Sequence, residues 1–175
     1  AAEPDPAAYA QQLTGLDDAA LEEEARGFGL SMQETGLVCP AHAALVREAA
    51  DRLQIPVIAV ALALDNVGRD SLDTFRGLCL GLIGRAVTPS TAQTVYSMAR
   101  LLESGILFFP PVAPGLWRLT SLELAPEVAT MLNKAPGIDA QVPPLNRLLA
   151  GTIGVLGQPL GVGQGDNPTC QSARA

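Results

Sequence analysis

The chain has 175 residues, of which 48% are hydrophobic and 4% aromatic, with a mean hydropathy of +0.25 and a formal net charge of −7 at pH 7. This length and composition allow a buried core and exclude global disorder, while the scarcity of aromatic residues favours packed helices over a sheet sandwich. The acidic balance disfavours nucleic acids and anionic membranes as partners, so we expect a mainly α, soluble protein.

The acidic charge is concentrated at the start of the chain. Residues 1–54 hold ten acidic and three basic residues, whereas 55–137 hold six of each and 138–175 hold two of each. We therefore predict three segments with these bounds: an acidic helical region, a winged-helix-like helical module, and a Gly-rich linker that leads to the start of a catalytic domain.

Helix signals divide the acidic region. Asp17 is a predicted N-cap for a helix that Gly27 would end, and Pro40 is the predicted first residue of a second helix that extends to Leu53. The run Glu22-Glu23-Glu24 is predicted to be a solvated helix face, with a docking patch as the alternative.

Three helices are predicted between residues 56 and 104. The run 56–64 is apolar on all sides, and its initial proline favours a buried helix over a central strand. Asp70 is the predicted cap of the next helix. The third is predicted over 90–104, where Gly105 would end it.

A β-hairpin is predicted next, because two short β-like runs, 106–109 and 116–120, flank a Pro-rich turn. With a helix predicted over 126–133, the order of elements in residues 55–135 resembles a winged helix, which implies that the helix over 90–104 enters the DNA major groove. That helix offers Arg100 and the hairpin offers only Arg118, so the charges favour a protein partner over DNA.

Aromatic and cysteine residues add little chemistry of their own. Trp117 is predicted to be a core anchor rather than a stacking platform for nucleic-acid bases. Cys39 and Cys79 are predicted to be small buried hydrophobic residues. Cys39 and His42 have a spacing that metal ligands can use, but no second pair accompanies them, so we expect no metal and no cofactor.

The last segment is predicted to begin with a short helix over 144–149 and to continue as a flexible Gly-rich connector. The glycines of 154–163 are not followed by Gly-Lys-Ser or Gly-Lys-Thr, so a phosphate-binding loop is disfavoured.

The end of the chain resembles the papain-like superfamily of peptidases, transglutaminase-like acyltransferases and deamidases. Gln164-Gly165 stands six residues before Cys170, as the Gln-Gly of that superfamily stands before its nucleophile. The resemblance implies that Cys170 is the nucleophile and Gln164 the oxyanion donor. The chain departs from the family at Gln171, where an aromatic residue is usual, and the family's His and Asn or Asp lie downstream, beyond Ala175.

Three functions follow from these patterns. We expect the N-terminal part of a papain-like cysteine hydrolase or acyltransferase, acting on a protein or peptide, with a helical accessory module and with its catalytic base outside this chain. The alternative is a non-enzymatic helical module that binds a partner protein. A DNA-binding winged helix is the third.

Overall fold

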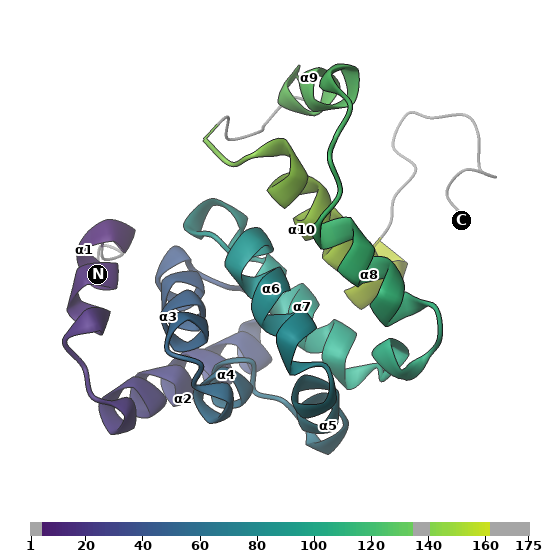
Figure 1. The fold of residues 1–175 in the computed structure, drawn as a ribbon. Helices are drawn as coiled ribbons and strands as arrows, with labels where there is room; N and C mark the ends of the chain where they lie inside the picture. The colour runs from purple at the N-terminus through teal and green to yellow at the C-terminus, as the bar shows by residue number, and fades with distance from the viewer. Residues whose placement is uncertain (1–4, 135–140, 162–175) are drawn as a thin grey trace.

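The computed structural model describes residues 5–134 and 141–161, which fold as an assembly of helices without strands (Figure 1). The α-helices are α1 (Pro6–Thr14), α2 (Asp18–Thr35), α3 (Pro40–Asp51), α4 (Ile55–Ala61), α5 (Asn66–Thr74), α6 (Arg76–Ala86), α7 (Thr94–Glu103), α8 (Val112–Thr120), α9 (Pro126–Lys134) and α10 (Pro144–Gly157). Short 3₁₀ helices are η1 (Pro89–Thr91), η2 (Ile106–Phe108) and η3 (Pro159–Gly161). The prediction of a mainly α protein is confirmed. Within the described residues, no helix is long and apolar enough to cross a membrane.

The predicted hairpin is wrong. Residues 106–108 form η2, and 116–120 are the second half of α8. Across all of α8 the inward positions recur at helical spacing, with Ala113 and Leu116 buried and Leu119 half-buried. A window of five residues is too short to distinguish this period from the alternation of a strand. The module over 55–135 therefore lacks the wing on which the resemblance to a winged helix depended.

Helix α2 continues past the predicted stop at Gly27 and ends at Gly36, which adopts the left-handed conformation at φ 69°. Asp17 caps its start as predicted, accepting a hydrogen bond from the amide of Ala20 at 2.8 Å. Gly27 is tolerated because α2 packs on α4 beyond it, where Gly29 lies against the backbone of Val60 and Ala61. Tertiary packing here outweighs the low helix propensity of glycine.

Other helix boundaries also differ from the prediction. Asp65, not Asp70, caps α5, accepting from the amide of Gly68 at 2.8 Å. The reciprocal capping box before α7 joins Thr88 to Thr91. Helix α10 extends to Gly157, beyond the predicted end at residue 149, because its C-terminal half packs on α7.

In the N-terminal half, helix α3 packs against α1, α2, α4 and α6. Three of its side chains donate to carbonyl oxygens at the ends of other helices. His42 Nε2 donates to Ala61 O at 2.8 Å, and Arg47 donates to the carbonyls of Gly84 and Val87 at 2.9 and 2.7 Å. His42, Arg47 and Arg52 are five residues apart, and side chains at this spacing point about 140° from each other around a helix. The three side chains therefore contact different neighbouring helices.

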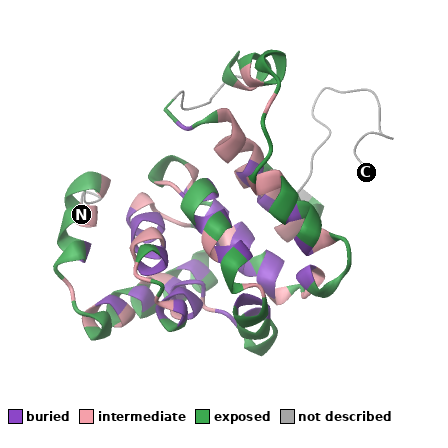
Figure 2. Ribbon diagram, viewed as in Figure 1, coloured by how far each residue is buried: buried purple, intermediate pink, exposed green. Residues whose placement is uncertain are grey.

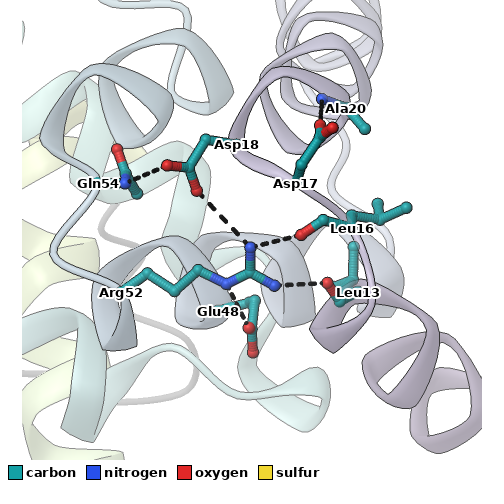
Figure 3. A network of polar contacts seen from close by, with 8 residues as sticks. All are labelled: Leu13, Leu16, Asp17, Asp18, Ala20, Glu48, Arg52 and Gln54. Carbon is teal, nitrogen blue, oxygen red and sulfur yellow. Dashed lines mark hydrogen bonds and ion pairs between the residues drawn. The ribbon is translucent and has the colours of Figure 1, made fainter.

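Arg52, at the end of α3, is the third of these side chains (Figure 3). Its guanidinium donates to the carbonyls of Leu13 and Leu16 and to the carboxylate of Glu48, each at 2.7 Å. Asp18 lies 3.7 Å from the same guanidinium. Arg52 thereby bonds one carbonyl in the last turn of α1 and one in the loop that leads to α2, and it holds α1 and α2 on α3.

Replacing Arg52 by methionine is expected to lower the free energy of unfolding by about 2 kcal/mol, because the two carbonyls and Glu48 lose a charged donor that fits them. Urea unfolding followed by circular dichroism measures the loss. Arg26→Met is the matched control, since the Arg26 side chain is 54% exposed against 22% for Arg52 and pairs only with Glu22 and Glu23 on its own helix. An equal loss in both variants would show that Arg52 does not hold the helices together.

The described helices share one cluster of buried apolar residues that extends from Leu13 in α1 to Ile153 in α10. Figure 2 shows buried segments inside the assembly and exposed strips on the outward sides of α6 and α8. Helix α1 and the acidic helix α2 lie on one side of the molecule and α8 on the other (Figure 1).

Candidate functional site

Gln164 and Cys170, the residues of the papain-like prediction, lie outside the described residues. The assignment of Cys170 as a nucleophile and Gln164 as an oxyanion donor therefore stays a prediction.

The two other cysteines differ in their surroundings. Cys79 is fully buried in α6, and desolvation raises the pKa of its thiol to about 12. The prediction that it is a buried hydrophobic residue is confirmed, and at neutral pH its thiol is unreactive. Cys39 is half-buried at the N-cap of α3. In the described part of the chain, no three His, Cys, Asp or Glu side chains come together in a way that could hold a metal ion.

Cys39 and His42 line a pocket of about 450 Å³ between α2 and α3, whose wall also includes Phe28. The His42 ring stacks on Phe28, with centroids 5.1 Å apart and planes 13° from parallel. Burial lowers the pKa of His42 from 6.5 to about 4, and its Nε2 proton is donated to Ala61 O. A histidine of such low basicity, bonded to a helix end, is a poor partner for activating a thiol at neutral pH. Its role here is structural.

A pocket of about 590 Å³ lies between α7 and the end of α10. Its charged groups have partners within the protein: Arg100 pairs with Glu103 at 3.1 Å, and Asp65 caps α5. Arg100 is also the base that the winged-helix resemblance placed on the DNA-reading helix. Its ion pair with Glu103 reduces the positive charge available to a phosphate.

The acidic run on α2 is also engaged in intramolecular contacts. Glu22 and Glu23 lie 3.1 and 3.5 Å from Arg26, and Glu24 accepts a hydrogen bond from the hydroxyl of Tyr9 at 2.9 Å. Glu23 and Glu24 are exposed, as a solvated face requires. These contacts partly neutralise the run and tie it to α1.

Exposed aromatic side chains gather on η2 and α8. Phe108, Phe109 and Trp117 are 48%, 72% and 57% exposed, and we call these three residues the aromatic surface. Phe108 packs edge-on against Phe75 with ring centroids 5.2 Å apart, and the Trp117 ring lies 3.9 Å from the Cβ position of Gly77. Phe75 and Gly77 both stand at the start of α6, so Phe108 and Trp117 each lie against that end of the helix.

This surface corrects the sequence prediction for Trp117, which is exposed rather than a core anchor. The reason is its register: in α8 the inward positions are taken by Ala113 and Leu116, and Trp117 projects beside them. A helix assigned to residues 112–120, with Ala113 and Leu116 on its inward side, would have predicted that Trp117 is exposed.

Comparison of the chain with models of known protein families, with curated proteins and with solved structures finds no match.

Proposed function

We propose that this protein is a helical module that holds a partner protein through the aromatic surface. The observation that carries the proposal is the exposure of Trp117 and Phe109 beside a core that is already complete without them. Large aromatic side chains supply much of the binding energy at protein interfaces, and leaving them in water is unfavourable. Their concentration on η2 and α8, rather than singly over the molecule, supports a binding surface.

The acidic run on α2 is the other docking candidate that the sequence offers. Its carboxylates already have partners in Arg26 and Tyr9, whereas Phe109 and Trp117 project into solvent. We therefore favour the aromatic surface. The hydrolase or acyltransferase prediction rests on Gln164 and Cys170 and is tested separately, by an activity assay with Cys170→Ser.

The test is affinity capture from the organism of origin with the wild-type chain and with the double variant Phe109→Ser/Trp117→Ser. We expect the partner to be identified by mass spectrometry and, once purified, to bind the double variant at least about tenfold more weakly, the loss of about 1.4 kcal/mol or more that interface anchors give. Leu37→Ser is the matched control, since Leu37 is 71% exposed against 72% for Phe109 and lies at the end of α2.

Two results would contradict the proposal. Capture that survives the double variant but fails after charge reversal of Glu22, Glu23 and Glu24 would move the site to α2. Activity on a peptide or amide substrate that is lost in Cys170→Ser, with partner capture unaffected by the double variant, would favour the papain-like prediction.

A further inference from the structure

Positive charge surrounds the aromatic surface. Helices α6 and α8 and the 3₁₀ helix η2 contain three arginines, Arg76, Arg85 and Arg118, and no acidic residue. Helix α10, which also packs on α8, carries Arg147 as its one charged residue. The nearest acids along the chain are Asp73, three residues before α6, Glu103, three residues before η2, and Glu123, three residues after α8.

Arg85 and Arg118 are available to a ligand. Both are exposed, and neither side chain makes an ion pair or hydrogen bond with another described residue. Arg76 is 3.5 Å from Asp73, and both side chains are mostly exposed, which makes the pair a weak one. A carboxylate of a ligand could therefore bind Arg85 and Arg118 without breaking an existing ion pair.

The exposed side of α6 also allows close approach. Gly77, Gly81 and Arg85 follow one another at intervals of four residues and so lie in line along the helix. A Cβ added at Gly81 would meet nothing within 4 Å, and Gly77 contacts only the Trp117 ring. From Gly77 to Arg85 the helix advances about 12 Å, the length of two turns of a second helix.

Resting on the function proposed above, we infer that the occupant of this surface is an acidic amphipathic helix of a partner protein. Its apolar side chains cover Trp117 and Phe109; one carboxylate, about two turns from this apolar anchor, pairs with Arg85, and another, beside the anchor, pairs with Arg118. Aromatic and arginine side chains in combination are typical of the residues that dominate such interfaces.

The net charge of −7 does not prevent this binding. The acidic excess belongs to residues 1–54, and α1 and α2 lie on the opposite side of the molecule from α8 (Figure 1). At physiological salt the screening length is about 8 Å, so the acidic helix α2 repels a ligand at α8 weakly, while contacts at Arg85 and Arg118 act at short range.

Trp117 is the one tryptophan of the chain, so its fluorescence reports directly on this surface. The probe is a helical peptide of about 18 residues with leucines at the i, i+3, i+4 and i+7 positions and glutamates elsewhere. Its matched control has lysine in place of every glutamate. With the full chain, we expect the glutamate peptide to shift the Trp117 emission to the blue and the lysine peptide to leave it unchanged.

Substitutions test the role of the arginines. Arg118→Glu is expected to weaken binding of the glutamate peptide by about tenfold and to allow binding of the lysine peptide. Arg26→Glu, the same charge change on the exposed side of α2, is the control and is expected to change affinity by less than about twofold, because it lies beyond the screening length.

Four outcomes would overturn the inference. If neither peptide binds, or if both bind equally, the occupant is not an acidic helix. The proposed function then still stands, provided that binding of the captured partner depends on Phe109 and Trp117. A Trp117 shift with chain concentration alone, with dimers in sedimentation, would make a second copy the occupant. A shift with phosphatidylserine vesicles and not with the peptide would indicate a membrane surface and would contradict the proposed function as well.

Discussion

Replacing Gly29 by alanine is expected to lower the free energy of unfolding by about 3 kcal/mol, the upper part of the range for overpacked cores. A Cβ at this position would lie 2.4 Å from the carbonyl oxygen of Val60 and 3.4 Å from that of Ala61. Both oxygens belong to the backbone of α4 and cannot rotate away, so the whole of α4 must move. Urea unfolding of the two proteins measures the difference.

Gly27→Ala is the matched control, two residues earlier in the same helix. An added Cβ there meets nothing within 4 Å, and Gly27 is exposed. Alanine is the better helix former, so this variant is expected to gain about 0.5–1 kcal/mol. Opposite signs in the two variants would confirm that α2 and α4 cross in contact at Gly29. A gain in stability in both variants would show that α2 and α4 are not in close contact at Gly29.

Acid is expected to destabilise the protein through His42 well before the carboxylates titrate. Burial lowers the pKa of His42 from 6.5 to about 4. Between these two pKa values His42 is protonated in the unfolded chain and neutral in the folded chain. The stabilisation is therefore fully present above pH 6.5 and decreases as the pH falls toward the folded-state pKa of about 4. The free energy of unfolding is expected to drop by about 2 kcal/mol from pH 7 to pH 5.

His42→Gln isolates this effect, because an amide can donate to Ala61 O and does not titrate in this range. The variant is expected to be less stable than wild type at pH 7, since glutamine loses the stacking on Phe28, and to be nearly insensitive to pH between 7 and 5. Urea midpoints for both proteins at pH 7, 6 and 5 give the comparison. If the variant loses as much stability between pH 7 and pH 5 as wild type, groups other than His42 are responsible for the loss.

Local signals located most of the helices correctly. Asp17, Pro40, Pro126 and Gly105 act within a few residues of themselves, by capping, by fixing φ, or by adopting positive φ, and each marks a helix boundary close to where it was predicted. The predictions that failed concern segments whose neighbours decide the outcome. Gly27 looked like a stop because the α2–α4 contact is not visible in the sequence.

The candidate site could not be predicted for the same reason. Phe108, Phe109 and Trp117 were visible as apolar residues, but a five-residue strand pattern and a five-residue piece of helix are alike. Their exposure depends on which side of η2 and α8 the core covers. The sequence did show the acidic excess of residues 1–54 and the absence of acids from 106 to 120, since charge is a property of composition.

By itself the sequence determined the helical class, the helix starts at Asp17 and Pro40 and the uneven charge, because these depend on the residues and their immediate neighbours. The tertiary structure alone decided that Gly29 is a crossing point, that His42 and Arg52 cap other helices, and that Trp117 faces solvent. Each of these depends on contacts between residues distant in the chain, which periodicity and composition do not contain.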